Sequence, residues 1–419
     1  MMHTVTKPRI GGPGGAVAAW AATRAALLVF VFQVVRFPGQ VVVHDVEDIY
    51  RGWYPVLRTG AFPAHDVAWQ YPPGAAVPLL APGGLPFLGY ASAFFVLALL
   101  ADAVVLGALL RDARHSGRMA GVWVWIGGTT LLGPIVYARY DVMVTAVAVP
   151  ALLALRRRPA LAGALAGFGG LLKLWPLLVL IGAPTSRTLR RSWAAAAATV
   201  AVLLGLSAAL MRNSMSFLAF QQHRGTEVES LGAMVFHVAR HLGWHGRVEM
   251  HYGSMEFLGP HVHLVSAAAL GLSVLGVCWL AWWRLRARRF TAATPYDAAF
   301  TALLVFTTTS RVISPQYMVW LVGAGAVCAA ARGTVLRLPL LLTLAAALFT
   351  TLEFPPFFSH VTAGDAWGLL LLGTRNALLV TASVMSCRRL WAATVPARTP
   401  GPTRPEPAEP DPRSTVLTP

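Results

Sequence analysis

Residues 156–191 read RRRPALAGALAGFGGLLKLWPLLVLIGAPTSRTLRR, a long apolar run between two clusters of arginine. A membrane-spanning helix needs about 20 apolar residues. Basic residues favour the cytoplasmic side, and a single crossing would put the two clusters on opposite sides. Because Lys173 and Pro176 interrupt the run, we expect a hairpin of two short helices, 159–170 and 174–183, meeting near Lys173. Small residues allow the close packing that a hairpin needs, and the first arm supplies Gly163, Gly167, Gly169 and Gly170.

Ten other stretches are apolar over a length near that of a membrane span. They are approximately 15–35, 89–110, 119–138, 141–155, 193–211, 261–283, 295–309, 316–331, 338–352 and 366–386. The composition agrees, since 56% of the residues are hydrophobic and 12% are charged, against about 25% charged in a globular domain. We therefore expect an all-α polytopic membrane protein of about ten full spans plus the hairpin, or about twelve helical segments. One or two soluble domains are excluded.

The positions of the charged residues predict the orientation. With the N-terminus in the cytoplasm, 22 of the 34 basic residues fall in cytoplasmic segments, nine in outer segments and three (Arg24, Lys173 and Arg375) within spans. Of the 17 acidic residues, 11 fall outside, five inside, and Asp102 lies within a span. This asymmetry follows the positive-inside rule with both termini cytoplasmic. It also accounts for the net charge of +17 without a nucleic-acid partner, because basic cytoplasmic segments are attracted to anionic lipid.

The chain divides into three regions. Residues 1–14 are polar and rich in Gly and Pro, which predicts a cytoplasmic N-terminal segment. We expect the first apolar run to be an uncleaved membrane anchor. Residues 15–389 predict the transmembrane domain. Residues 390–419 are dense in Pro, Thr and Arg and predict a disordered cytoplasmic tail. The three cysteines are isolated, which excludes a disulfide scaffold and a Cys/His metal motif: they are Cys278, Cys328 and Cys387.

Two outer loops, 36–88 and 212–260, are too long to be simple connections. Both are rich in aromatic residues, histidine and paired charges, so we expect the chemistry on the outer side. In the first loop, Asp45 and Asp48 are three residues apart, which would put them on one face of a helix. A carboxylate beside apolar walls can act as a general base. The alternative is an acidic cluster that caps a helix over Ile49–Arg58.

Several short motifs in order along the chain resemble glycosyltransferase family 87. In the first loop they are Tyr50, Trp53, Leu57, Gly60, Pro63, Asp66 and the run Gln70-Tyr71-Pro72-Pro73-Gly74. Further along they are Arg139-Tyr140-Asp141, Lys173-Leu174-Trp175-Pro176, His223-Arg224-Gly225 with Glu229-Ser230, and Ser314-Pro315-Gln316-Tyr317 with Trp320. Each motif is weakly specific alone, and their common order carries the resemblance.

The resemblance implies a membrane-embedded enzyme of the GT-C fold, similar to the polyprenol-phosphate-mannose-dependent α-(1→2)-mannosyltransferases of actinobacteria. Such an enzyme moves a hexose, here expected to be mannose, from a polyprenyl-phosphate donor to a lipid or glycan acceptor at the outer face, with inversion. The acid of the first loop takes the proton of the acceptor hydroxyl. Asp45 matches that position best, although the interval from Asp45 to Tyr50 keeps Asp48 as the alternative.

The leaving phosphate of such a donor needs fixed cations. Arg139, Lys173, Arg224 and Arg311 are the candidates, since three are outer arginines near span ends and one is an intramembrane lysine. Two alternatives are a simple Arg139–Asp141 pair and a lysine that extends to the membrane surface. Residues expected to contact substrate are Tyr50, Trp53, Trp69, Tyr71, Asp141, Glu229, His223, Gln316, Tyr317 and His360.

The sequence has no Walker loop, no GxGxxG and no clear DxD motif, so we expect a lipid-linked donor and neither cofactor nor metal. His237 and His241 have a spacing that zinc sites use, but without a third ligand they fit better on an amphipathic interfacial helix, opposite Phe236, Val238 and Leu242. The alternative function is a secondary transporter or flippase, which would show inverted repeats and midplane acids. A non-catalytic scaffold of the cell envelope is a third possibility.

The topology is tested by single cysteines at positions 57, 157, 189 and 240 in a chain whose three native cysteines are replaced by serine. We expect an impermeant maleimide to label intact cells at 57 and 240, and to label 157 and 189 only after permeabilisation. Labelling at 189 from outside would contradict the hairpin.

Overall fold

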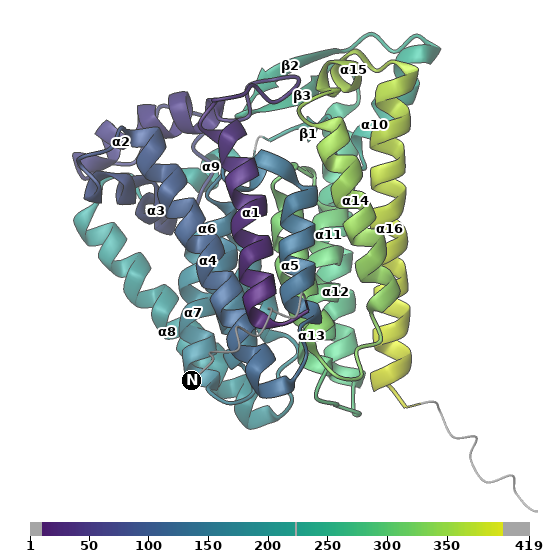
Figure 1. Cartoon of the computed structure of the whole chain (residues 1–419). Helices are drawn as coiled ribbons and strands as arrows, with labels where there is room; N and C mark the ends of the chain where they lie inside the picture. Colours follow the sequence, from purple (N-terminus) through teal and green to yellow (C-terminus); the bar gives the residue numbers. More distant parts are fainter. Residues whose placement is uncertain (1–10, 223, 397–419) are drawn as a thin grey trace, which may run out of the picture.

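Helices run between the two ends of a bundle, and one end carries much larger loops than the other (Figure 1). The computed structural model describes residues 11–222 and 224–396. The helical elements are α1 (Pro13–Val31), η1 (Asp45–Tyr50), α2 (Arg51–Arg58), η2 (Pro73–Ala75), α3 (Ala76–Leu80), η3 (Ala81–Gly84), α4 (Tyr90–Ser116), α5 (Ala120–Leu131), η4 (Gly133–Val136), α6 (Asp141–Ala154), α7 (Pro159–Leu172), η5 (Trp175–Leu180), α8 (Ser186–Leu210), α9 (Phe217–Gln222), α10 (Ala233–Ala239), η6 (Arg240–Leu242), α11 (Val262–Arg286), α12 (Thr294–Thr309), α13 (Tyr317–Ala330), α14 (Arg337–Glu353), α15 (Phe358–Ala363) and α16 (Ala366–Thr394). The strands are β1 (Thr226–Glu227), β2 (Arg247–His251) and β3 (Ser254–Leu258).

Each of the ten apolar stretches contains a helix. Within the described residues, five helices are long and apolar enough to cross a membrane: α1, α4, α8, α11 and α16. The helices in the other five stretches have 12 to 17 residues, fewer than the approximately 20 that a full span needs. Ten full crossings therefore stay a prediction, as do the cytoplasmic termini.

Local sequence explains several helix ends. α8 and α16 begin at Thr185 and Asp365, whose side chains accept hydrogen bonds from the free N–H groups of the first turn. α4 ends at Gly117, which has a left-handed φ of 71°. α16 continues to Thr394, so residues 390–394, which we expected in the disordered tail, are helical. The rest of that tail from residue 397 and the first ten residues of the N-terminal segment lie outside the described residues.

The run 159–182 is broken at Lys173, as the sequence predicts. α7 ends at Leu172, Lys173 is extended (φ −152°, ψ 144°), and the second arm is the 3₁₀ segment η5 rather than an α-helix over 174–183. A Cβ on Gly169 or Gly170 would lie 2.8 Å from Pro176 or Leu177 of the second arm. These glycines therefore allow the two arms to pack closely.

The other two glycines of α7 pack against a different element. A Cβ on Gly163 would lie 2.0 Å from the carbonyl oxygen of Ser192, and one on Gly167 would lie 2.7 Å from that of Ala196. Both partners are on α8, so Gly163 and Gly167 bring α7 and α8 into backbone contact rather than closing the hairpin.

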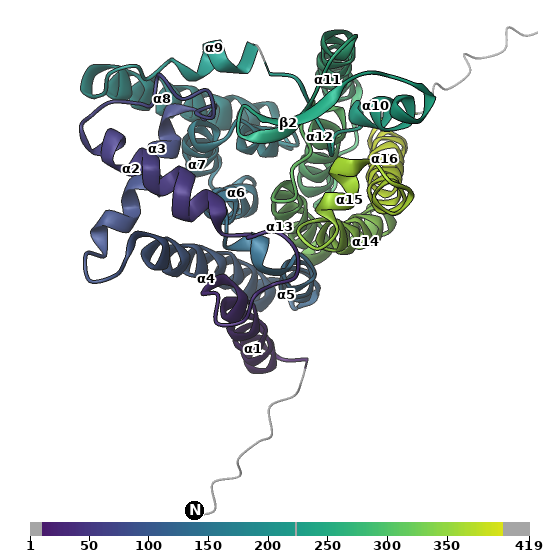
Figure 2. The same cartoon turned by 90° about the horizontal axis from the view of Figure 1, so that it is seen from above.

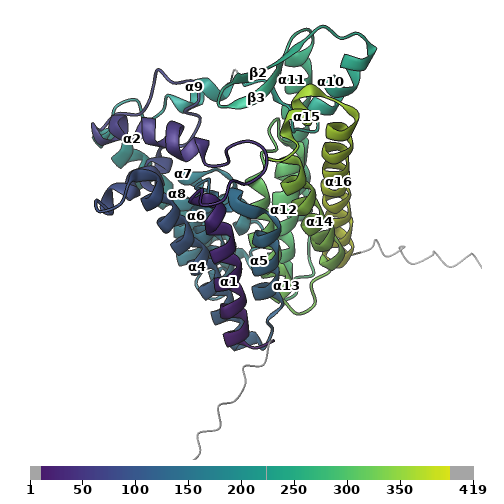
Figure 3. The same ribbon diagram turned by 45° about the horizontal axis from the view of Figure 1, so that its top comes forward.

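The two long loops meet at the same end of the bundle, called the loop-rich end below (Figure 3). The second loop contains an antiparallel three-stranded sheet of order β1-β3-β2, which corrects the all-α prediction. Seen from above, α9 lies at the edge of the bundle between α8 and α11, and β2 lies further towards its middle (Figure 2). Polar and apolar residues alternate only briefly in 247–258, and aromatic residues flank this stretch. The sequence therefore shows no clear sign of a strand there.

A buried ion pair links three helices on the α1 side. Arg24 of α1 donates from Nε to Asp102 of α4 at 2.7 Å, and both side chains are buried. Asp102 also accepts hydrogen bonds from Trp20, Trp125 and Tyr137. The intramembrane acid that a transporter would use for proton or ion coupling is thus fully paired, and it holds α1, α4 and α5 together.

Removing one partner of this pair tests its structural role. Asp102→Leu leaves the Arg24 guanidinium buried without a counter-charge, which costs about 3–5 kcal/mol, whereas replacing both partners by apolar residues is often neutral. We therefore expect a large fall in Tm for Asp102→Leu in detergent micelles. The double variant Arg24→Met/Asp102→Leu should recover most of it, and equal Tm values for the two variants would contradict the role.

Candidate active site

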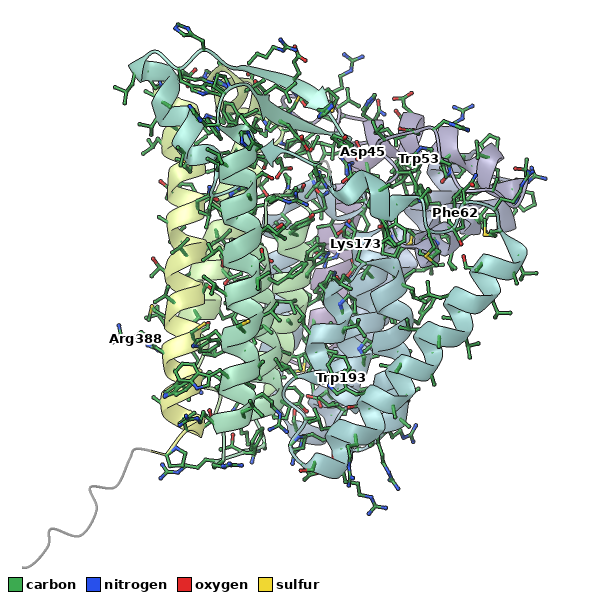
Figure 4. All side chains as sticks on the ribbon, turned by 180° about the vertical axis from the view of Figure 1, so that it is seen from behind. Asp45, Trp53, Phe62, Lys173, Trp193 and Arg388 are labelled. Carbon is green, nitrogen blue, oxygen red and sulfur yellow. The ribbon has the colours of Figure 1, made fainter. Side chains whose placement is uncertain are left out.

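A cavity of about 670 Å³ opens among the first loop, the hairpin, α8, the segment between α12 and α13, and the second loop. Asp45 and Trp53 lie at the loop-rich end above Lys173, whereas Arg388 lies towards the opposite end (Figure 4). The cavity is therefore assembled from segments that are far apart in the sequence.

Asp45 begins the π-helical turn η1 and lines this cavity. Its Oδ2 lies 2.8 Å from Nε of Arg139, and its side chain is 22% exposed. Arg139 is fixed in turn by hydrogen bonds from Nη1 to the carbonyl oxygens of Val42 and Ala138. Arg139 itself does not line the cavity, so its guanidinium lies behind the carboxylate of Asp45.

Asp48 has a different partner. Its carboxylate pairs with His44 at 2.6 Å, and its side chain is 64% exposed. Asp45 and Asp48 both line a neighbouring cavity. Of the two acids, Asp45 alone also lines the first cavity, where the cations lie.

Lys173 lies in the floor of the cavity, where its Nζ donates to Oδ1 of Asp141 at 2.7 Å. The same oxygen accepts a hydrogen bond of 2.7 Å from Nε1 of Trp320. Four rings surround the ammonium at 4.9–5.7 Å, a distance at which aromatic faces attract a cation: Tyr71, Tyr140, Tyr317 and Trp320. Lys173 therefore points into the protein and does not extend to the membrane surface. Asp141 pairs with Lys173 and Arg139 pairs with Asp45. The alternative of a simple Arg139–Asp141 pair is therefore also wrong.

Arg224 and Arg311 line the cavity from the second loop and from the segment between α12 and α13. Arg224 donates to Ser254 at 3.0 Å and lies 3.4 Å from the buried Glu256. Arg311 donates from Nη1 to the carbonyl oxygen of Arg224 at 3.0 Å. The guanidinium group of Arg311 is thus held next to Arg224 by the backbone of Arg224.

Glu227 holds the segment that carries Arg311. Its carboxylate accepts hydrogen bonds from the backbone N–H of Ile313 at 2.7 Å and from the hydroxyl of Ser314 at 2.8 Å. Burial raises the pKa of Glu227, and these two hydrogen bonds oppose that shift. The sequence motif drew attention to Glu229 instead and missed this residue.

The cavity brings together nine of the residues expected at the site: Asp45, Tyr50, Trp53, Tyr71, Lys173, Arg224, Arg311, Gln316 and Tyr317. Trp69 lies behind them, with its ring 5.1 Å from that of Trp53. Burial, followed by the nearby Asp45 and Asp141 charges, raises the pKa of Tyr71 to about 12, so it remains a neutral phenol. One carboxylate and three cations thus face a cavity with aromatic walls.

Other expected residues lie away from this cavity. Glu229 pairs with Arg375 of α16 at 3.0 Å, and Glu353 of α14 approaches the same guanidinium at 3.3 Å. His360 pairs with Asp365 at 2.5 Å. Both residues are therefore used in contacts within the fold. His223 lies outside the described residues.

The histidines of the second loop have structural contacts. His237 is buried, with Nε2 2.8 Å from the carbonyl oxygen of Val228, and His241 lies 2.9 Å from that of Gly364. On the other face, Phe236 is buried, whereas Val238 and Leu242 are exposed. Within residues 11–222 and 224–396, no group of three or more His, Cys, Asp or Glu side chains could hold a metal ion.

The family motifs contain Trp175 and Trp320, but the sequence analysis gave these two residues no role at the site. Trp175 and Trp320 stack at 5.4 Å, and Tyr317 stacks on Trp320 at 4.0 Å. The spacing of Tyr317 and Trp320, three residues apart in α13, was a usable signal for the second contact. Tyr252 and Ser254 come from the turn between β2 and β3, and no local pattern connects that turn with the hairpin.

The family model for glycosyltransferase family 87 matches residues 69–315, more than half of the chain. The matched range includes Tyr71, Lys173, Arg224 and Arg311 and begins after Asp45. No curated protein and no solved structure matches the chain. The matched range and the apolar helices lead to one conclusion: this chain belongs to glycosyltransferase family 87 and is a membrane glycosyltransferase.

Proposed function

We propose that the protein transfers a hexose, with mannose favoured, from a polyprenyl-phosphate donor to a hydroxyl group of a lipid or glycan acceptor. The observation that carries this proposal is the cavity in which Asp45 faces Lys173, Arg224 and Arg311. A single carboxylate suits proton abstraction, and three fixed cations suit a leaving phosphate. Family membership favours this enzyme over the transporter or flippase alternative.

The shape of the cavity supports a lipid-linked donor. Val200 and Leu204 of α8, Leu174 of the hairpin and Phe306 of α12 form an apolar part of its wall. Most of α8 is exposed, including Val202 and Leu206, as expected for a helix that faces lipid. A donor could thus keep its prenyl chain on the α8 side while its phosphate reaches the cations.

The reaction follows from these positions. Asp45 takes the proton of the acceptor hydroxyl while the acceptor oxygen forms a bond to the anomeric carbon of the sugar. The bond between that carbon and the phosphate oxygen breaks, and its electron pair leaves on polyprenyl phosphate. One displacement inverts the anomeric configuration. Lys173, Arg224 and Arg311 stabilise the charge that develops on the phosphate, and groups placed in advance do this at little reorganisation cost.

Two further groups support catalysis without touching the phosphate. Arg139 orients Asp45 through their 2.8 Å ion pair, so we assign it as a positioning residue rather than a phosphate ligand. Tyr71 and Tyr317 line the cavity close to Lys173, where their rings can pack against the faces of a sugar.

The proposed orientation puts the loop-rich end outside the cell membrane. The clusters Arg156–Arg158 and Arg187–Arg191 flank the hairpin, whose two arms begin and end on the same side. The positive-inside rule assigns that side to the cytoplasm. The active site then faces the extracytoplasmic side, where nucleotide sugars are absent and a lipid-linked donor is needed.

The base is tested by Asp45→Asn, which keeps the size of the side chain and removes its basicity. We expect turnover to fall by about 10²–10⁴-fold, the usual contribution of a general base, with binding of the donor largely retained. The assay is transfer of radiolabelled mannose from polyprenyl-phosphate mannose by the purified protein.

Asp48→Asn is the comparison variant, because Asp48 pairs with His44 and lines the neighbouring cavity but not the one that holds the cations. It should lose far less turnover than Asp45→Asn. Loss of activity in Asp48→Asn alone would assign the base to Asp48, and full activity in both variants would contradict the proposed mechanism.

The donor proposal predicts that activity survives EDTA, because the three cations of the cavity replace a divalent metal at the leaving phosphate. Arg311→Gln should lower kcat by about 10²–10³-fold, as loss of one such donor does. Arg311→Lys, which keeps the charge, should retain more activity than the glutamine variant. A strict requirement for Mn²⁺ or Mg²⁺, or use of a nucleotide sugar, would contradict the proposal.

A further inference from the structure

A second cavity, of about 1230 Å³, adjoins the first at the loop-rich end. Asp45 lines both cavities, together with Ile49, Trp53, Ala68, Tyr252 and Gly253. Any group that occupies the second cavity and reaches Asp45 therefore meets the same carboxylate that faces the three cations from the other side.

The walls of the two cavities come from different parts of the chain. The first is lined in part by α7, α8, α12 and α13, which belong to the helical bundle. The described residues around the second come from segments 44–68, 212–213 and 250–253, all within the two long loops. No candidate membrane span of the described residues contributes to this part of the structure, so we expect an occupant to enter from water rather than from lipid.

The charges of the two cavities also differ. Lys173, Arg224 and Arg311 line the first with Asp45, which favours an anion. The described charged residues of the second are Asp45, Asp48, Asp66 and Arg212, together with three histidines. An excess of carboxylates disfavours a phosphate or carboxylate group and suits hydroxyl groups, which donate hydrogen bonds to carboxylates.

Most of the residues that line the second cavity are apolar, but its lining also includes aromatic and polar side chains of the kinds that bind carbohydrate. Trp53 and Tyr252 supply aromatic surface, and His65 and Asn213 are exposed polar side chains. Asp66 is held in place, since its two oxygens accept hydrogen bonds from Nε1 of Trp53 and the backbone N–H of Ala68. Its carboxylate is therefore pre-oriented beside the aromatic surface.

We infer that the second cavity is the acceptor site, and that it takes the uncharged end of a water-exposed glycan rather than the anionic headgroup of a membrane lipid. This inference rests on the proposed function and specifies its acceptor. A terminal hydroxyl of the glycan reaches Asp45 through the shared wall, while the donor sugar approaches from the first cavity.

Gly52 provides a direct test. It lines only the second cavity, and a Cβ built on it meets no heavy atom within 4 Å. Gly52→Trp should fill the cavity without disturbing the fold, and Gly52→Ala is the matched control, since alanine is favoured over glycine in a helix such as α2. The readout is binding of a neutral α-mannotriose to the purified full-length protein, measured by saturation-transfer NMR.

We expect the wild type and Gly52→Ala to bind the trisaccharide, and Gly52→Trp to bind it more weakly by about tenfold or more, which corresponds to roughly 1.4 kcal/mol. A phosphate monoester of the same trisaccharide should bind the wild type more weakly than the neutral sugar. Leu204→Trp, which alters only the first cavity, should leave trisaccharide binding unchanged.

Three outcomes would overturn the inference: no binding of the trisaccharide to the wild type, binding that Gly52→Trp leaves intact, or preference for the phosphate ester. Binding of only an octyl glycoside of the sugar, insensitive to Gly52→Trp, would indicate entry from the membrane and would also overturn it. Failure of the proposed function is seen separately, as absence of turnover of polyprenyl-phosphate mannose by the wild type, and does not depend on these binding measurements.

Discussion

The ion pair between Lys173 and Asp141 connects the hairpin to the rest of the bundle. A lysine at this depth is costly unless its charge is compensated, and Asp141 at the start of α6 provides the compensation at 2.7 Å. Trp320 of α13 donates to the same carboxylate, so three elements meet at one oxygen atom. The hairpin can therefore place a cation in the floor of the cavity without leaving a buried charge unpaired.

The same constraint explains two other buried pairs. Arg24 with Asp102 joins α1 to α4, and Arg375 lies between Glu229 and Glu353. The basic residues that the sequence analysis assigned to span interiors are thus each paired with at least one carboxylate. Such pairs do not necessarily increase stability relative to apolar residues, but breaking one is strongly destabilising. They therefore restrict how the helices can be arranged.

The arrangement of charges separates two chemical tasks at Asp45. On one side the cavity carries cations and an apolar wall from α8, and on the other it carries carboxylates and loop residues. An anionic lipid donor and an uncharged acceptor would then approach the base from different directions. Arg139 holds the carboxylate of Asp45 between the two cavities through their ion pair. The side chain of Arg139 is 10% exposed.

Much of the fold could be predicted from composition and patterning alone. The apolar stretches contain helices because lipid offers no hydrogen-bonding partners. A helix satisfies the N–H and C=O groups of its own backbone. The break at Lys173 could be predicted because Pro176 and a charged residue interrupt the run, and because two arginine clusters require the same side. The sequence allowed a group of phosphate-binding cations to be proposed, because few basic residues lie in outer segments or within spans. This group included Lys173, Arg224 and Arg311.

Other features depended on contacts between distant segments. The spacing of Asp45 and Asp48 did not show that the first pairs with Arg139 and the second with His44. The partner of Asp141 is 32 residues away, and that of Arg139 is 94 residues away, so sequence proximity suggested the wrong pair. The small sheet and the second cavity form only where two long loops meet, and such pairings are decided by tertiary packing rather than by local propensity. The sequence by itself thus determined the helical membrane class and the types of residue at the site, whereas the tertiary structure decided which charges face each other, because charge pairing acts through space and not along the chain.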